Sequence, residues 1–179
     1  LKVTGFTGGP AIRFEAGSSG SVLLGSQIGD PTLTSARNQR GVSIVGPNVT
    51  IGGLAATDGN LISGSQTENV HVAGAANTRI VGNVIGSPVG VQGSSGETGI
   101  ALDGPLAGTI IGGPEPEAGN VISGHGGWGM KLDGASGVTS MRNSIGTDRS
   151  GAANPNRRGG IYLDNATTGM VSSGDRIAH

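Results

Sequence analysis

One aliphatic residue recurs along the whole chain, each time two positions after a small polar residue. The isoleucines of this pattern are Ile28, Ile62, Ile85, Ile122, Ile145 and Ile177, and the polar residues before them are Ser26, Asn60, Asn83, Asn120, Asn143 and Asp175. A pattern that returns every 20 to 50 residues or so is typical of stacked repeats such as solenoids and propellers. The repetition constrains the fold more strongly than any local preference for helix or strand.

A second pattern fixes the length of the repeat. Segments that alternate apolar and other residues start at positions 12, 42, 70, 100, 130 and 161, which gives spacings of 30, 28, 30, 30 and 31 residues. Alternation with a period of two is typical of a strand with one buried face. The predicted inward pairs are Ile12 and Phe14, Val42 and Ile44, Val70 and Val72, Ile100 and Leu102, Met130 and Leu132, and Ile161 and Leu163.

Two further short strands are expected in each repeat. The second set covers residues 22–25, 49–53, 79–82, 109–113, 139–142 and 170–173, and the third set contains the isoleucine pattern. Three short strands joined by turns make one coil of a three-sided solenoid, and stacked coils lie about 4.8 Å apart. The sequence therefore predicts an all-β fold, a right-handed parallel β-helix of about six coils that forms a single domain over residues 1–179.

A longer period of 60 residues overlies the repeat. Residues 51–53 (IGG) return at 111–113, and GNLISG at 59–64 returns as GNVISG at 119–124. Coils two and four carry extra residues between their second and third strands, at 54–59 and 114–119. Coils one, three and five carry them after the third strand, at 30–40, 87–98 and 147–160. The loops are therefore expected at two different edges of the rod.

The asparagines before the isoleucines are predicted to be structural. Asparagine tolerates the left-handed backbone conformation and forms local hydrogen bonds, so it suits a tight corner. Asparagines at the same corner of successive coils can also hydrogen-bond to one another through their amides. A role in ligand binding is the alternative.

The composition excludes several classes of protein. Glycine accounts for 37 of the 179 residues, and the only aromatic residues are Phe6, Phe14, Trp128 and Tyr162, so the interior must be narrow and aliphatic. A net charge of −1 gives no reason to expect nucleic acid as a partner. The chain has no cysteine and no run of roughly 18 apolar residues that could span a membrane. An extracellular or cell-surface location is compatible with these features and is our expectation.

The repeat resembles a known family at two motifs. GNVISG at 119–124 and IGTDRSG at 145–151 are similar to the repeats of bacterial right-handed parallel β-helix proteins of the pectate-lyase-like superfamily, and the similarity extends over residues 11–179. The resemblance implies the β-helix fold. It also implies a choice among polysaccharide lyases, glycoside hydrolases, epimerases, adhesins and non-enzymatic surface proteins, because that superfamily contains all of them.

Three aspartates are predicted to stack on consecutive coils. Asp103, Asp133 and Asp164 end the first strands of coils four, five and six and face outward. Like charges about 5 Å apart repel one another, so a shared proton, the cations Lys131, Arg157 and Arg158, or a bound cation must offset them. Calcium, which prefers several oxygen ligands, is the only cofactor that the sequence suggests. Alternatively, these aspartates only form turns by accepting backbone N–H groups.

A catalytic interpretation assigns roles to the same residues. In an enzyme, Asp133 and Asp164 would act as acid and base, with Lys131 and Arg157 stabilising developing negative charge. Carboxyl groups on adjacent coils would approach the separation of about 5 Å that retaining glycosidases use. The segment around His125 resembles the GHG motif of polygalacturonases, but the acidic motifs that accompany it in that family are missing.

A binding interpretation depends on the aromatic residues. Trp128 lies in a glycine-rich turn and could stack on a sugar ring, with Tyr162 and Arg158 as further contacts. The alternative is that Trp128 folds over the edge of a coil and has only a structural role.

The two ends of the rod have no polar cap in the sequence. Neither residues 1–10 nor residues 173–179 have the atypical polar character that closes most solenoids. We therefore expect the chain either to be part of a longer solenoid that continues into further coils or to pack end to end with another copy. Open strands invite self-association, and head-to-tail contacts build filaments. Three functions follow as expectations: a structural or adhesive module that assembles end to end, a polysaccharide-processing enzyme, or a non-catalytic polysaccharide-binding region.

Overall fold

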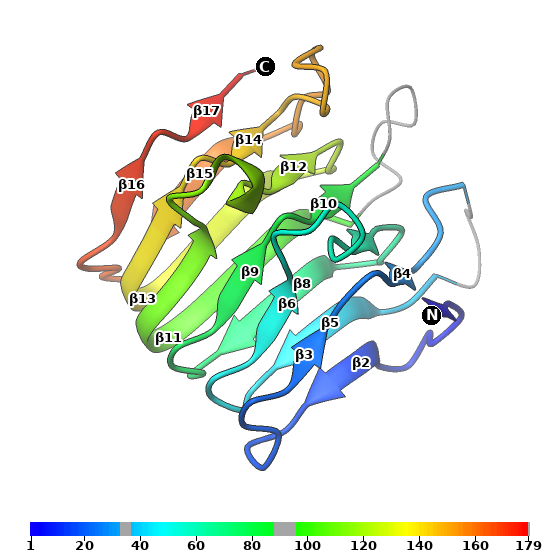
Figure 1. Cartoon of the computed structure of the whole chain (residues 1–179), viewed down its shortest axis with the longest axis horizontal. Helices are drawn as coiled ribbons and strands as arrows, with labels where there is room; N and C mark the ends of the chain where they lie inside the picture. Colours follow the sequence, from blue (N-terminus) through cyan, green and yellow to red (C-terminus); the bar gives the residue numbers. More distant parts are fainter. Residues whose placement is uncertain (33–36, 88–95, 179) are drawn as a thin grey trace.

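The chain folds into a parallel β-solenoid. The computed structural model describes residues 1–32, 37–87 and 96–178. The backbone winds through about five turns, and the two termini lie at opposite ends of the rod (Figure 1). All strand pairs between coils are parallel, and β-strand dominates the fold, with one short 3₁₀ helix, η1 (Pro116–Ala118), among the described residues. The predicted fold class is confirmed.

The isoleucine pattern forms one continuous row, row three. Its strands form a 7-stranded sheet in the order β1 (Lys2–Val3), β4 (Gln27–Ile28), β7 (Leu61–Ile62), β10 (Val84–Gly86), β12 (Val121–Ser123), β14 (Ser144–Ile145) and β17 (Arg176–Ile177). Ile28 pairs with Ile62, and the pairing continues through Ile85, Ile122 and Ile145 to Ile177. The predicted interior row is therefore confirmed.

The first and second predicted strand sets form rows one and two. Row one contains β2 (Pro10–Phe14), β5 (Arg40–Ile44), β8 (Glu68–Ala73), β15 (Gly159–Asp164) and the first halves of β11 (Thr98–Gly112) and β13 (Trp128–Met141). Row two contains β3 (Val22–Leu23), β6 (Thr50–Gly52), β9 (Arg79–Val81), β16 (Val171–Ser173) and the second halves of β11 and β13. The chain makes five turns in passing through the six row-one strands. The six predicted coils therefore agree with the observed winding of about five turns.

Rows one and two are not fully separate sides, in contrast to the prediction. In coils four and five the chain passes from row one to row two within a single long strand, β11 or β13, and the two rows join into one bent sheet. The pairing of β11 with β13 shifts register on both sides of Pro105, which marks the corner. Local irregularities of this kind increase the bend of a strand without ending the pairing.

The core is a narrow stack of aliphatic side chains. Val42, Ile44, Ile51, Ile80 and Leu102 are fully buried, as are five isoleucines of row three. Row one approaches row three so closely that only glycine fits at the contact. A Cβ atom on Gly41 would lie 2.8 Å from Cγ2 of Ile62, and one on Gly99 would lie 2.7 Å from Cγ2 of Ile122. The corresponding distances are 2.7 Å from Gly129 to Ile145 and 2.4 Å from Gly160 to Ile177. The high glycine content therefore serves packing as well as turns.

The corner asparagines form a hydrogen-bonded ladder through the interior. Asn60, Asn83, Asn120 and Asn143 are at most 1% exposed. Oδ1 of Asn83 accepts the backbone N–H of Asn60 at 3.0 Å and its Nδ2–H at 2.9 Å. The same pair of bonds joins each later asparagine to its predecessor, and Asp175 ends the ladder as the acceptor for Asn143. The predicted stacking of these amides is confirmed.

The prediction that these asparagines adopt the left-handed backbone conformation was wrong. None of the ladder asparagines has a positive φ. In coils three and five the left-handed residue is the one just before the ladder, Gly82 at 68° and Arg142 at 56°. The asparagine is needed for its amide, because the N–H groups at this corner are buried and require an acceptor.

The two end faces of the rod remain apolar. In the last coil Leu163 and Ile177 are 52% and 50% exposed, although their counterparts in inner coils are buried. At the other end Phe6 is 50% exposed, and Ile12 and Phe14 are only partly buried. The predicted inward pairs are thus fully buried only in coils two to five.

Two predictions remain to be compared with the structure, the positions of the long loops and the lack of a membrane span. The loops predicted at 30–40 and 87–98 lie partly outside the described residues, at 33–36 and 88–95. Within the described chain, no helix has the length and apolar character needed to cross a membrane.

Candidate functional site

The predicted aspartate column exists on the outer face of row one. Asp103 pairs with Asp133, and Asp133 pairs with Asp164, so the three carboxylates stand on consecutive coils. Beside them in the same strands runs a second outward column, in which Lys131 pairs with Tyr162. The register of the parallel strands therefore brings together the three aspartates and Lys131, which the sequence assigned to metal binding or catalysis, but not Arg157.

Neighbouring side chains offset the charges of this column. Nζ of Lys131 lies 3.0 Å from Oδ2 of Asp133, and Nδ2 of Asn165 donates to Oδ1 of Asp133 at 2.6 Å. Nε2 of His71 lies 2.7 Å from Oδ2 of Asp103. Asp164 instead accepts the backbone N–H of Asn165 at 2.9 Å, which is the turn role proposed as the alternative. The aspartates thus combine ion-pair and turn functions.

The electrostatics of the column favour an ionised Asp133. Hydrogen bonds from Asn165 and then from Lys131 hold the pKa of the Asp133 carboxyl below its usual range. The hydrogen bond to Asp133, aided by the charges of Asp164 and Asp103, raises the pKa of Lys131. Asp133 consequently stays ionised, which makes it a weak base and a poor proton donor and suits it better to anchor a cation.

An aromatic groove lies next to the aspartate column. The rings of Trp128 and Tyr162 stack with their centroids 4.7 Å apart and their planes 13° from parallel. Both rings line a hollow of about 380 Å³, together with Lys131 and Arg158 and with two acidic residues, Glu68 and Glu97. The structure therefore gathers all three residues predicted to bind a substrate, Trp128, Tyr162 and Arg158, around one groove.

The stack has a local cause in the sequence. Gly159 pairs with Trp128 and has a φ of 145°, and a Cβ atom at this position would lie 2.7 Å from Cζ3 of the indole. Glycine therefore lets the Trp128 ring lie flat over the next coil and reach Tyr162. The stack on Tyr162 is consistent with both roles considered for Trp128, a structural one over the edge of a coil and the binding of a sugar ring.

Arg157 is separate from the groove. Its backbone N–H donates to the carbonyl of His125 at 3.0 Å, and its side chain is exposed and not part of the groove lining. Glu68, by contrast, was not predicted as part of a site. Burial alone would raise the pKa of Glu68, but hydrogen bonds from Arg40 and Thr67 lower it below the usual value. Glu68 is thus a fixed negative charge at the edge of the groove.

No described cluster is arranged as a metal centre. Over residues 1–32, 37–87 and 96–178, no group of three or more histidine, aspartate or glutamate side chains could hold an ion. A calcium site at Asp103, Asp133 and Asp164 therefore stays a prediction from the sequence.

His125 lies in the interior of the rod. It is fully buried, its Nε2 accepts from Nδ2 of Asn69 at 3.1 Å, and its Nδ1–H donates to Oδ1 of Asn156 at 2.8 Å. Burial lowers the pKa of His125 to about 4, against the opposing effect of the hydrogen bond to Asn156. The imidazole is therefore a neutral structural link between coils, and the resemblance of this segment to a catalytic motif has no functional counterpart here.

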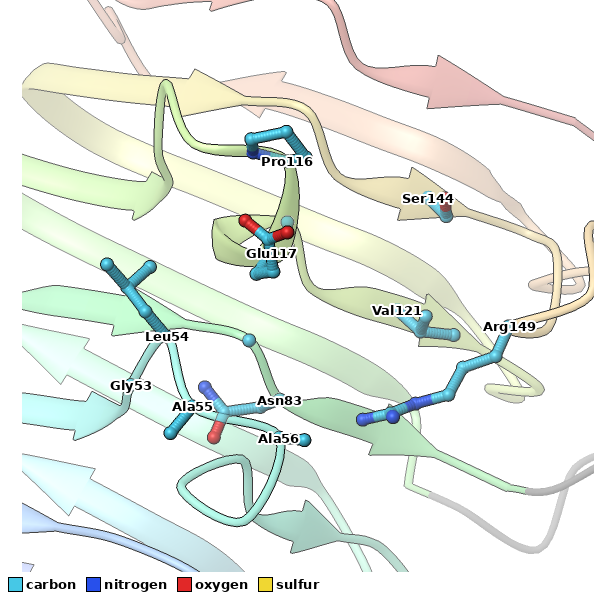
Figure 2. A pocket seen from close by; sticks show the side chains of 12 residues that line it. Gly53, Leu54, Ala55, Ala56, Asn83, Pro116, Glu117, Val121, Ser144 and Arg149 are labelled. Atoms are coloured by element: carbon cyan, nitrogen blue, oxygen red, sulfur yellow. The ribbon is translucent and has the colours of Figure 1, made fainter.

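A second hollow was not predicted from the sequence. The loop at 54–56 and the helix η1 stand on either side of the tight turn at Gly82 and Asn83, and Arg149 reaches toward this turn from the opposite edge of the sheet (Figure 2). The hollow has a volume of about 350 Å³. The alternation of long and short turns in the 60-residue period was the signal that could have revealed it.

The comparisons with known proteins assign no family to the chain. Neither the protein-family models nor the curated protein sequences gave a match.

Proposed function

We propose that this chain is a structural segment of an extracellular or cell-surface β-solenoid and that copies stack head to tail into longer rods. The observation that carries the proposal is the match between the two apolar end faces. Ile177 ends the row that begins with Val3, and Leu163 ends the row that contains Phe14 and Ile44. A second copy continues these rows in the same parallel geometry that joins the coils within one copy.

Stacking of this kind is heterologous, so each added copy leaves a new open face. It also brings together the outward residues at the ends of row three. Lys2 begins the row that Arg176 ends, so these two cations approach each other at the junction. Asp30, whose Oδ2 lies 3.2 Å from Nζ of Lys2, offsets part of their repulsion. The remainder opposes the apolar contact, and salt screens it. Head-to-tail association is therefore expected to strengthen as ionic strength rises.

Sedimentation velocity and electron microscopy of the purified protein test the proposal. The wild type should form rods whose length increases with protein concentration and with salt. Ile177→Lys places a charge in the apolar face and should abolish association, whereas Arg176→Glu removes the repulsion with Lys2 and should promote it. A monodisperse monomer at every concentration, or equal behaviour of both variants, would contradict head-to-tail stacking.

The resemblance to bacterial pectate-lyase-like β-helix proteins supports a location outside the cell, because that superfamily contains many surface proteins. The aspartate column supports a non-catalytic role, because Asp133 already forms an ion pair with Lys131 and Asp103 already contacts His71. These contacts stabilise the column. The rod then acts through its length and its surface.

Saccharide binding is a second candidate function, favoured by the stacked pair of Trp128 and Tyr162. Aromatic rings beside charged groups are common in sugar-binding grooves. Trp128 is the only tryptophan, so its fluorescence reports directly on this groove. Titration with neutral and uronic-acid oligosaccharides should change the emission of the wild type and not that of Tyr162→Ala. An unchanged spectrum with every saccharide would remove this candidate.

Incubation with the same oligosaccharides, followed by analysis of the products, tests a catalytic version of the second candidate. A polysaccharide lyase, hydrolase or epimerase would release or alter product, and both Asp133→Asn and Asp164→Asn would abolish the reaction. Arg157→Gln would leave it unchanged, because among the described residues no hydrogen bond or ion pair joins this side chain to the aspartate column, and it does not line the groove.

A further inference from the structure

The hollow beside Arg149 owes its shape to alternating turn lengths. β10 lies between β7 and β12, and its connection to β9 consists only of Gly82 and Asn83. The neighbouring coils insert residues 53–60 and 113–120 at the same edge. These two loops therefore rise as walls on either side of coil three, and the short turn between them forms the floor (Figure 2).

Both walls carry apolar side chains. Leu54, Ala55 and Ala56 form one wall, and Pro116 belongs to the other. Val121 continues the floor along the outer face of the sheet, where an adjoining hollow of about 350 Å³ also contains Val84 and Arg149. The combined space is within the usual size range of ligand pockets, which is roughly 300–1,000 Å³.

The loop that presents Arg149 is held in place. Oδ1 of Asp148 accepts the backbone N–H of Ser150 at 2.8 Å, its hydroxyl at 2.7 Å and the backbone N–H of Ala152 at 2.9 Å. An antiparallel bridge between Thr147 and Ala153 closes the loop. From this base the Arg149 side chain extends past Val121 toward the turn at Asn83 (Figure 2), and its Nη2 atom would lie 3.8 Å from a Cβ atom on Gly59.

Two opposite charges in this hollow lack a partner. In the part of the chain that the structure describes, neither Arg149 nor Glu117 takes part in an ion pair. Both side chains line the same hollow, Arg149 from the far edge and Glu117 from η1. A guanidinium binds a carboxylate through paired hydrogen bonds, and a carboxylate binds an ammonium group.

We infer that this hollow binds a short apolar peptide with free termini. Arg149 receives the terminal carboxylate, Glu117 receives the terminal ammonium group, and the apolar side chains contact Leu54 and Val121. The apolar side chains of the walls favour an apolar ligand, and the presence of both signs of charge disfavours simple anions and simple cations. The inference is independent of head-to-tail stacking, because the hollow lies on the side of the rod and not at its ends.

A set of four peptides tests the charge assignments. The probes are alanyl-valyl-alanine and its N-acetylated, C-amidated and doubly blocked forms. Binding is followed by calorimetry and by NMR shifts of the methyl groups of Val84 and Val121. The free peptide should shift both valines, and blocking either terminus should weaken binding about tenfold, as expected for loss of one charge-assisted bond.

Two variants separate the ends of the peptide. With Arg149→Gln, the free and C-amidated peptides should bind equally, while N-acetylation still weakens binding. With Glu117→Gln, the free and N-acetylated peptides should bind equally, while amidation still weakens binding. Arg79→Gln and Glu115→Gln are matched exposed controls outside the lining and should behave as the wild type. Absence of any methyl shift, or equal binding of all four peptides to the wild type, would overturn the inference.

Discussion

Oδ1 of Asn120 accepts two hydrogen bonds from Asn83, one from its backbone N–H at 2.9 Å and one from its side-chain Nδ2–H at 3.0 Å. The same Asn83 amide also donates to the carbonyl of Ile51 in the preceding coil at 2.9 Å. One side chain thus ties together three coils in the fully buried interior. Because each asparagine must both donate and accept, only an amide satisfies every group inside the ladder, while its last member needs only to accept.

This asymmetry predicts opposite outcomes for two exchanges of amide and carboxylate. Asn83→Asp removes the side-chain donations to Ile51, Val81 and Asn120 and buries a charge between acceptors, so it should lower the free energy of unfolding by about 3 kcal/mol or more. Asp175→Asn keeps the acceptor for Asn143 and should change it by less than about 1 kcal/mol. Urea denaturation of both variants measures the difference. Equal effects at the two positions would contradict the ladder.

The close approach of row one to row three predicts that Gly99 cannot be replaced. A Cβ atom there would lie 2.5 Å from the carbonyl oxygen of Gly129 and 2.7 Å from Cγ2 of Ile122. Gly99→Ala should therefore destabilise the fold by roughly 1–3 kcal/mol, as overpacking does. In Gly126→Ala the nearest atom is 3.4 Å away, so this control should melt near the wild type. A Gly99→Ala protein as stable as the control would refute the packing described here.

Burial of His125 predicts a loss of stability in mild acid. Its pKa falls from 6.5 to about 4 on folding, so the unfolded chain binds the proton more tightly than the folded chain does. The contribution of His125 is complete above pH 6.5 and is lost as the pH falls to about 4, by roughly 3 kcal/mol in total.

The measurement is the free energy of unfolding against pH for the wild type and for His125→Gln, in which this titration is absent. NMR of the His125 ring gives a direct check, because its carbon shifts should stay constant between about pH 8 and 5. A ring that titrates near its ordinary pKa would contradict the buried neutral state.

Lys131 should stabilise the aspartate column to a modest and salt-sensitive degree. Lys131→Met removes the cation paired with Asp133 and leaves the three carboxylates less compensated, so a loss of up to about 1 kcal/mol is expected at low salt. The loss should shrink in high salt, where the repulsion is screened. Arg13→Met, which removes only the exposed pair with Glu15 in coil one, is the control and should have almost no effect. A loss that does not depend on salt would indicate packing as its cause.

Calcium tests the metal prediction for the same column. If Asp103, Asp133 and Asp164 bind the ion, calcium should raise the melting temperature of the wild type, since ligands stabilise the state that binds them. Asp133→Asn should abolish the shift. An unchanged melting temperature at millimolar calcium would eliminate a metal site and leave Lys131 and His71 as the groups that offset the column.

The sequence predicted the rows of this structure better than its corners. The isoleucine row and the pairing of Asp103, Asp133 and Asp164 followed from spacing alone, because repeats of nearly equal length stack their strands in register. The left-handed residues at Gly82 and Arg142 and the merging of rows one and two at Pro105 did not follow. Those features depend on how each turn closes against the coil above it.

Contacts between side chains that are far apart in the sequence could not be predicted either. His125 pairs with Asn69 and Asn156, which are 56 and 31 residues away, and no local pattern marks the three as partners. The groove gathered Trp128 and Tyr162 because both lie on row one, but Glu68 joined them only through the geometry of the coils. Arg149 reaches a hollow at the opposite edge because a long side chain crosses the sheet.

Hydrogen exchange of the asparagine side-chain amides, followed by NMR, tests the central claim that an interior ladder and aliphatic rows hold the coils together. The account predicts that the Nδ2 protons of Asn60, Asn83, Asn120 and Asn143 exchange only on global unfolding, while those of the exposed Asn48 and Asn165 exchange rapidly. Equally fast exchange at the buried and the exposed positions would contradict it.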